Sequence, residues 1–162
     1  MLVHHSPHRL SPFRTVCLQM HDNDLRTSHH QVFRSMLEAL GRKDWDAGFA
    51  LMTEDVLCDW PYKPIPDMPS EMQGRDTIRE FFANGQEPFD GLNYQIDRIY
   101  ELLDPDLLIA EYRSDSRHRD SGIPYRNAYL GILRFRDGKV SYWREYINPQ
   151  TISELFAALH AR

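Results

Sequence analysis

The sequence predicts an α+β fold in which N-terminal helices pack on a curved, mostly antiparallel sheet. Apolar residues recur at helical spacing as far as about residue 82, and after Gly91 the period changes to two. The Asp137-Gly138 pair lies between two apolar runs, as is typical of a tight β-hairpin. Long strands twist and curl. We therefore expect helices laid across the concave face of a cone-shaped barrel.

The helices are expected in four places. The first begins near Ser28 and ends before Gly41, and a second short helix covers about 44–52. Gly74-Arg75-Asp76 opens the third helix, with Asp76 in its first turn. A final helix follows Pro149.

The strands are expected mainly in the second half of the chain. A turn and strand at 53–60 come first, and an extended segment follows at 61–69, where four prolines exclude regular structure. The four long strands that form the meander are placed at 92–103, 106–119, 124–136 and 139–148.

Composition limits the classes of function. The chain has 162 residues, which fits one domain, and a net charge of −5 with no basic stripe, so we expect no nucleic-acid partner. No apolar run is long enough for a membrane span. Cys17 and Cys58 are far apart and give neither a disulfide framework nor a metal motif, which favours the cytoplasm.

The first 27 residues lack any sustained period and are expected to form a flexible extension. His4, His5 and His8 lie in this segment, but no carboxylate or cysteine accompanies them, so a polar tail is preferred to a metal site. We expect neither a metal nor a cofactor.

Four segments carry a resemblance to a known family. Residues 43–56, 74–84, 127–140 and 143–149 resemble, in the correct order, the SnoaL-like proteins and ketosteroid isomerases of the nuclear-transport-factor-2-like superfamily. The resemblance covers about 28–160. It implies a cystatin-like α+β barrel as one domain over 28–162, a pocket for a small organic ligand, and a homodimer formed through the exposed sheet face.

The resemblance does not extend to ketosteroid-isomerase chemistry. Carried over by the motifs, the catalytic base falls on Trp60, the tyrosine on Met36 and the oxyanion-binding aspartate on Gly131. The developing negative charge would lack its donors. Asp59 is a candidate displaced base, but a shift of one residue along a strand turns a side chain to the opposite face.

The chain is more similar to the phenazine-biosynthesis A/B proteins. Shared features are Asp104-Pro105 before a strand bearing Glu111, an Asn at 127, and the segment Arg144-Glu145-Tyr146-Ile147-Asn148-Pro149. The resemblance implies that Glu145 faces the cavity as an acid/base group. The histidine that this family has on the third helix is replaced by Phe81.

The residues give an independent reason to select Glu145. Trp143, Glu145 and Ile147 share one face of the last strand. If this is the core face, burial raises the pKa of Glu145 toward neutrality and suits it to proton transfer. The alternatives are that Arg144 points inward instead, or that Glu145 is a structural partner of a core residue.

Further residues are candidates for ligand contact. Tyr129 and Asn127 share a face with Gly131, and aromatic core packing is the alternative for them. Trp60 and Tyr62, with the 61–69 segment, are expected at the mouth of the pocket. The remaining candidates are Phe81, Trp143, Met36 and His118, the last of which is also compatible with a solvent-exposed strand end.

Three functions follow from this sequence. The first is a cofactor-independent acid/base enzyme, of the isomerase, cyclase or dehydratase type, acting on a small cyclic or carbonyl compound. The second is a non-catalytic small-ligand-binding protein. The third is a protein-interaction module, which no feature of the sequence favours.

Overall fold

The computed structural model describes residues 12–63, 65 and 67–161, with side chains from residue 20 onward. Four helices and six strands follow one another in the order α1(Pro12–Gly41), α2(Trp45–Ala50), β1(Met52–Asp59), β2(Glu71–Gln73), α3(Arg75–Gly85), β3(Asn93–Glu101), β4(Leu107–Arg117), β5(Pro124–Arg136), β6(Lys139–Ile147) and α4(Pro149–His160). The α+β class is therefore confirmed, and the four long strands begin and end within two residues of the predicted positions.

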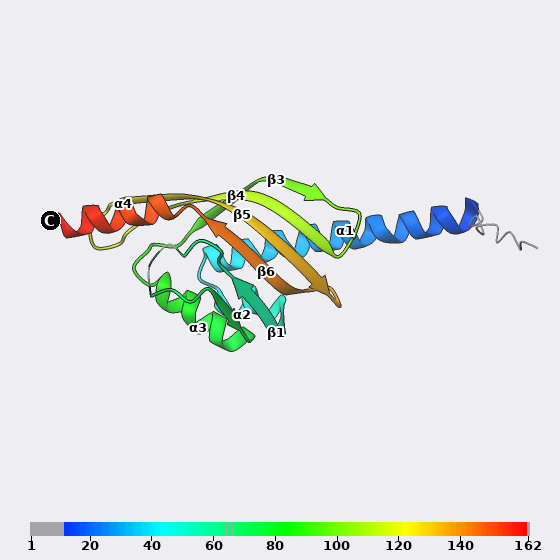
Figure 1. Ribbon diagram of the computed structural model, residues 1–162, viewed down its shortest axis with the longest axis horizontal. Helices are drawn as coiled ribbons and strands as arrows, with labels where there is room; N and C mark the ends of the chain where they lie inside the picture. The colour runs from blue at the N-terminus through cyan, green and yellow to red at the C-terminus, as the bar shows by residue number, and fades with distance from the viewer. Residues whose placement is uncertain (1–11, 64, 66, 162) are drawn as a thin grey trace, which may run out of the picture.

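One curved sheet contains all six strands, in the order β2-β1-β6-β5-β4-β3. Figure 1 labels five of them, from β1 to β3 in this order. Strands β3 to β6 form the antiparallel meander that the alternating pattern predicts. Strand β1 pairs with β6 in parallel. This pairing brings the end of β1, where Trp60 follows, beside the stretch of β6 that bears Glu145.

The core lies between the sheet and helices α1 and α3. Helix α1 crosses the sheet in Figure 1, and its second half contributes apolar side chains that are at most 3% exposed. Burial of this kind stabilises by about 1.5–3 kcal/mol for each large side chain. The α1 residues in this core are Phe33, Met36, Leu37, Ala39 and Leu40.

Helix α1 corrects one prediction. It begins at Pro12 and not near Ser28, so residues 12–27 are helical. Residues 20–28 are exposed or half-buried, and the Arg26 guanidinium donates a hydrogen bond to the Leu103 carbonyl at 3.2 Å. A largely solvated helix carries no apolar stripe, which explains why periodicity missed it. Where the domain begins stays a prediction, and His4, His5 and His8 lie outside the described residues.

A short edge strand follows the proline-rich segment. Glu71–Gln73 forms β2, which pairs antiparallel with β1 and which the alternating pattern did not predict. Three residues are too few for a recognisable alternation. Among the helices that the structure describes, none combines the length and the apolar character needed to cross a membrane.

Candidate functional site

A cavity of about 210 Å³ lies between the sheet, helix α3 and helix α4. Its walls are mostly aromatic and aliphatic, and its exposed members, Gly85 and Phe156, mark the side on which it opens to solvent. The described residues that line it are Trp60, Ile65, Met68, Phe81, Phe82, Gly85, Gln86, Phe89, Leu92, Tyr94, Tyr125, Tyr129, Glu145, Ile147, Ile152, Leu155 and Phe156.

Glu145 is the charged residue of this lining. It lies on β6 on the same face as Trp143, so the core face of β6 is the one predicted, and Glu145 is 5% exposed. Opposite it on β5 is Gly131, where a Cβ atom would lie 3.1 Å from the Tyr112 ring, so the glycine allows that ring to approach. Strand alternation therefore puts a carboxylate in an apolar cavity and turns Arg144 outward.

Two hydrogen bonds orient the Glu145 carboxylate. The Tyr112 hydroxyl donates to Oε1, and the Trp60 indole nitrogen donates to Oε2 at 3.4 Å. Burial raises the pKa of Glu145 from the ordinary 4.5 to about 7, while these two hydrogen bonds oppose the rise. The group can therefore both accept and donate a proton near neutral pH.

Tyrosine hydroxyls surround this carboxylate. The rings of Tyr112 and Tyr129 stack at 5.0 Å, and the Tyr129 hydroxyl pairs with the Ser114 hydroxyl at 2.8 Å. Burial raises the pKa of Tyr94, Tyr112 and Tyr129 well above the ordinary 10. These hydroxyls stay protonated at neutral pH and act as hydrogen-bond donors, and the Tyr112 hydroxyl already donates to Glu145.

Asn127 and Tyr125 form a second polar pair on β5. Asn127 is buried but lies behind the cavity, not in its lining. Its amide nitrogen donates to the Tyr125 hydroxyl at 2.9 Å and to the Asn148 carbonyl at 3.2 Å. The sequence predicted direct ligand contact by Asn127. Instead, Asn127 positions Tyr125, which does line the cavity.

Asp59 lies on the opposite face of the sheet from the cavity. Arg144 is its neighbour on β6 and donates to both of its carboxylate oxygens, with the shortest contact at 2.7 Å. Tyr142 donates a further hydrogen bond at 3.0 Å. The hydrogen bonds from Arg144 hold the pKa of Asp59 below its usual value. The structure thus places this carboxylate in an ion pair and outside the lining of the cavity.

The other predicted ligand contacts divide into three groups, which line the cavity, lie in the core behind it, or lie at the surface. Trp60 and Phe81 line the cavity, with ring centroids 5.5 Å apart. Met36 and Trp143 are buried in the core behind it. Tyr62 is 62% exposed and packs edge-on against Tyr146, so it does not form the mouth as predicted. Ile65 and Met68 represent the 61–69 segment in the lining instead.

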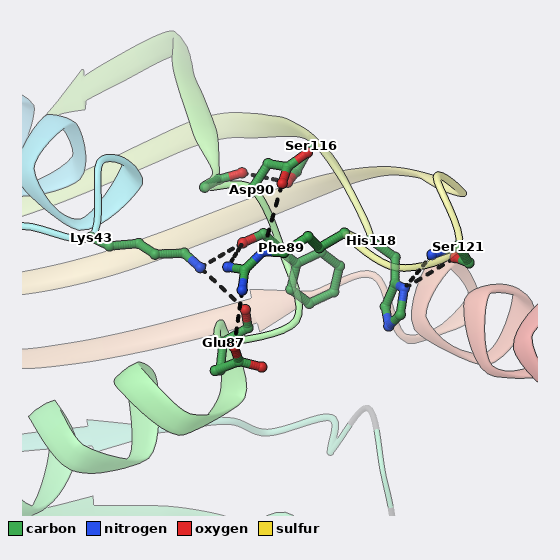
Figure 2. Close-up of polar contacts among 9 residues, drawn as sticks. Lys43, Glu87, Phe89, Asp90, Ser116, His118 and Ser121 are labelled. Atoms are coloured by element: carbon green, nitrogen blue, oxygen red, sulfur yellow. Dashed lines mark hydrogen bonds and ion pairs between the residues drawn. The ribbon is translucent and has the colours of Figure 1, made fainter.

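His118 also lies outside the lining. Its ring packs edge-on against Phe89 at 6.1 Å and is turned toward Ser121, whose hydroxyl is 3.0 Å from Nδ1 (Figure 2). Phe89, the residue against which His118 packs, does line the cavity. His118 therefore supports a wall residue and is not placed to contact a ligand directly.

The segment from Gln86 to Leu92 forms one wall and is fastened from both sides. The Leu92 amide donates to the Gly41 carbonyl at 3.0 Å, so the wall is tied to the end of α1. Figure 2 shows the Lys43 ammonium directed at the backbone carbonyls of Glu87, at 3.3 Å, and Phe89. Arg119 donates to the same Phe89 carbonyl at 3.1 Å. These contacts hold the backbone of the segment that carries Phe89.

Sequence reasoning missed four polar residues of the site, which are Tyr94, Tyr112, Tyr125 and Gln86. Tyr112 and Tyr94 alternate inward on β4 and β3, so the period-2 pattern could have selected them, but nothing in that pattern distinguishes them from core tyrosines. Gln86 follows the end of α3, where no periodic signal exists. Its side chain reaches the cavity only because of how α3 packs against the sheet.

Comparisons with known proteins show to which family this chain is related. The SnoaL-like domain matches residues 33–143. An uncharacterized PhzA/B-like protein of Pseudomonas aeruginosa is 32% identical over 108 residues, which are 67% of this chain and 74% of that protein.

Solved structures agree on the fold. A candidate isomerase from Bacillus subtilis has a TM-score of 0.74 at 23% identity, over 81% of this chain and 94% of its own. A computationally designed binder of 17-OHP has a TM-score of 0.66 at 20% identity, over 76% and 95% of the two chains. At these identities the two structures show the fold alone. On the family match and the similarity to the Pseudomonas protein, the chain belongs to the SnoaL-like domain family of the NTF2-like fold.

Proposed function

We propose that this protein is a cofactor-independent acid/base enzyme acting on a small cyclic or carbonyl compound. The observation that supports this most is Glu145, whose carboxylate lies in an apolar cavity with a pKa raised to about 7. A carboxyl with this pKa is present in both protonation states at neutral pH, as proton transfer in both directions requires.

The reaction follows from the groups in the cavity. Glu145 removes a proton from the carbon next to a ligand carbonyl. The electron pair of the broken C–H bond forms a C=C bond, and the π electron pair of the carbonyl moves to its oxygen, which gives an enolate. Tyr125 or Tyr129, both in the lining, donates a hydrogen bond to that oxygen. Return of the proton from Glu145 to a different atom gives an isomer. Loss of a β-hydroxyl group, which leaves with its electron pair and takes up the proton from Glu145 to form water, gives a dehydration product.

This scheme differs from that of a true ketosteroid isomerase. Trp60, Met36 and Gly131 occupy the positions that the resemblance assigns to the base and the two oxyanion donors of those enzymes. Here the base comes from β6 and the donors come from β5. We therefore propose an isomerase, cyclase or dehydratase type of activity without proposing a steroid substrate.

The experiment uses exchange of hydrogen for deuterium. The protein is incubated in D₂O with 2-cyclohexenone, a ring of suitable size, and loss of the proton signals next to the carbonyl is followed by NMR. We expect the protein to accelerate exchange and Glu145→Gln to abolish the acceleration. Glu111→Gln is the matched control, because Glu111 lies on β4 and is exposed. Equal exchange by wild type and Glu145→Gln excludes Glu145 as the proton carrier.

A non-catalytic binding protein is the alternative. It is favoured by one observation: among the described residues of the lining, Glu145 has no histidine, lysine, arginine or second carboxylate beside it. If the protein only binds its ligand, 2-cyclohexenone should bind and be recovered without deuterium. The homodimer and the cytoplasmic location stay predictions, and light scattering at micromolar concentration tests the first.

A further inference from the structure

The carboxylate of Glu145 has only neutral hydrogen-bond partners. It belongs to a residue that is 5% exposed, and its two hydrogen bonds come from the Tyr112 hydroxyl and the Trp60 indole. Buried charges in folded proteins are normally paired with an opposite charge or bind a metal ion. Among the described residues of the cavity lining there is no lysine, arginine or histidine. The cavity is therefore electrostatically complementary to a positively charged ligand.

The titratable groups around Glu145 do not supply a positive charge either. Arg144, the next residue on β6, is turned to the other face of the sheet and is paired with Asp59. The groups that interact electrostatically with Glu145 come from β1, β3, β4 and β5, and burial raises the pKa of each of them: Cys58, Tyr94, Tyr112, Tyr125 and Tyr129. All five are neutral near pH 7. Among these groups Glu145 alone changes its charge there, so the pH dependence of ligand binding reports on this carboxyl.

The walls of the cavity suit an organic cation better than a metal ion. Trp60, whose indole contacts the carboxylate, has ring centroids of Phe81 and Phe82 at 5.5 Å and 6.3 Å. Aromatic rings attract ammonium groups, and most strongly where water is excluded. A metal ion needs several oxygen, nitrogen or sulfur ligands, and no three His, Cys, Asp or Glu side chains come together in the part of the chain that the structure describes. The aromatic members of the lining are Trp60, Phe81, Phe82, Phe89, Tyr94, Tyr125, Tyr129 and Phe156.

We propose that the cavity binds a small organic ammonium ion, whose positive charge is held by the Glu145 carboxylate and the aromatic side chains around it. This inference rests on the cavity of the proposed function and names its ligand class, but it does not require Glu145 to transfer a proton. The size of the cavity agrees with such a ligand. A cavity of about 150 Å³ holds benzene, so one of about 210 Å³ has room for an ammonium group with several carbon atoms.

Choline and 3,3-dimethyl-1-butanol are the probes, because they have the same shape and differ in charge, a carbon atom replacing the nitrogen. Dissociation constants are measured by NMR titration. At pH 8 we expect wild type to prefer choline about tenfold, which corresponds to about 1.4 kcal/mol. With a pKa of about 7 for Glu145, the ionised fraction falls about tenfold between pH 8 and pH 6, so the preference should nearly disappear at pH 6.

Three variants separate the contributions of charge and rings. Glu145→Gln should bind both probes about equally at both pH values. Phe81→Leu removes one ring from the wall and should weaken choline binding about threefold at pH 8 while the affinity for dimethylbutanol is kept. Glu111→Gln removes an exposed carboxylate from β4 and is the matched control, with the preference of wild type.

The outcomes are separable from those of the proposed function. Equal affinity of wild type for the two probes at pH 8 overturns the inference, and so does failure to bind choline at millimolar concentration. A preference that Glu145→Gln retains also overturns it, because the charge is then recognised elsewhere. The affinity for dimethylbutanol shows whether each variant keeps its cavity. If Glu145→Gln loses the preference for choline but leaves deuterium exchange unchanged, the ligand class stands and the proposed acid/base function is wrong.

Discussion

Replacing Glu145 by glutamine should stabilise the protein at alkaline pH and not at acidic pH. Burial raises the pKa of this carboxyl from the ordinary 4.5 to about 7. Below pH 4.5 the group is protonated in the folded and the unfolded chain alike. Between pH 4.5 and about 7 the folded chain keeps a proton that the unfolded chain releases, so stability falls as the pH rises. Above about pH 7 the full cost of the buried charge is present.

The size of the effect follows from the two pKa values. Each pKa unit corresponds to about 1.4 kcal/mol, so the rise costs the folded state on the order of 3 kcal/mol once Glu145 is ionised. Glutamine avoids this cost. Its oxygen still accepts from Tyr112, but its amide nitrogen cannot accept from Trp60, which costs about 1 kcal/mol at any pH. At pH 5 the cost of ionising Glu145 is already about 1 kcal/mol and offsets this loss, so the variant should be about as stable as wild type at pH 5 and about 2 kcal/mol more stable at pH 8.

Urea unfolding followed by far-UV circular dichroism measures this difference at both pH values. Glu111→Gln, on the exposed face of β4, makes the same chemical change without burial and should shift stability equally at pH 5 and pH 8. A Glu145→Gln difference that is also independent of pH would refute the reasoning, because it would mean that the carboxyl has an ordinary pKa in the folded protein.

The remaining predictions concern the surroundings of the cavity. Tyr112→Phe removes a hydrogen bond that opposes the raised pKa of Glu145, so the pKa should rise by about one unit further, as measured by ¹³C NMR of the carboxyl. A fall in that pKa would contradict the orientation of the hydroxyl. Asp59→Asn breaks a half-exposed ion pair on the far face of the sheet and should cost about 1 kcal/mol in urea unfolding, with the deuterium exchange rate unchanged. A large loss of exchange would place Asp59 in the reaction after all. Lys43→Met removes the ammonium from the carbonyls of the cavity wall and should speed ligand dissociation severalfold, with a stability loss of about 1–2 kcal/mol. Arg42→Met, at an exposed position in the same loop, should change neither quantity. Equal effects of the two variants would show that Lys43 does not hold the wall in place.

The meander was predictable because its signal is local. Each of the four long strands alternates between a core face and a solvent face, and this pattern appears directly in the sequence, as in the regular burial of β5. The parallel pairing of β1 with β6 was not predictable in the same way, since it joins segments that are far apart in the chain. The N-terminal part of α1 was missed because its residues 20–28 bury little apolar surface.

The site was predictable to the extent that strand alternation determines it. Trp143 and Ile147 flank Glu145 on one face of β6, and that was sufficient to place the carboxylate inward. Strand alternation also indicated that Asp59 lies on the face of the sheet away from the cavity, where it pairs with Arg144. The contact between Tyr112 and Glu145 depends on the register of three neighbouring strands, and the reach of Gln86 depends on helix packing, so neither has a local signature.

The most direct test of the central claim is the pH dependence of deuterium exchange into 2-cyclohexenone. Exchange catalysed by Glu145 as a base should rise with pH, reach half its maximum near pH 7, and be absent from Glu145→Gln after subtraction of the buffer rate. An exchange rate without this midpoint, or one that Glu145→Gln retains, would show that the buried carboxylate is not the group that moves the proton.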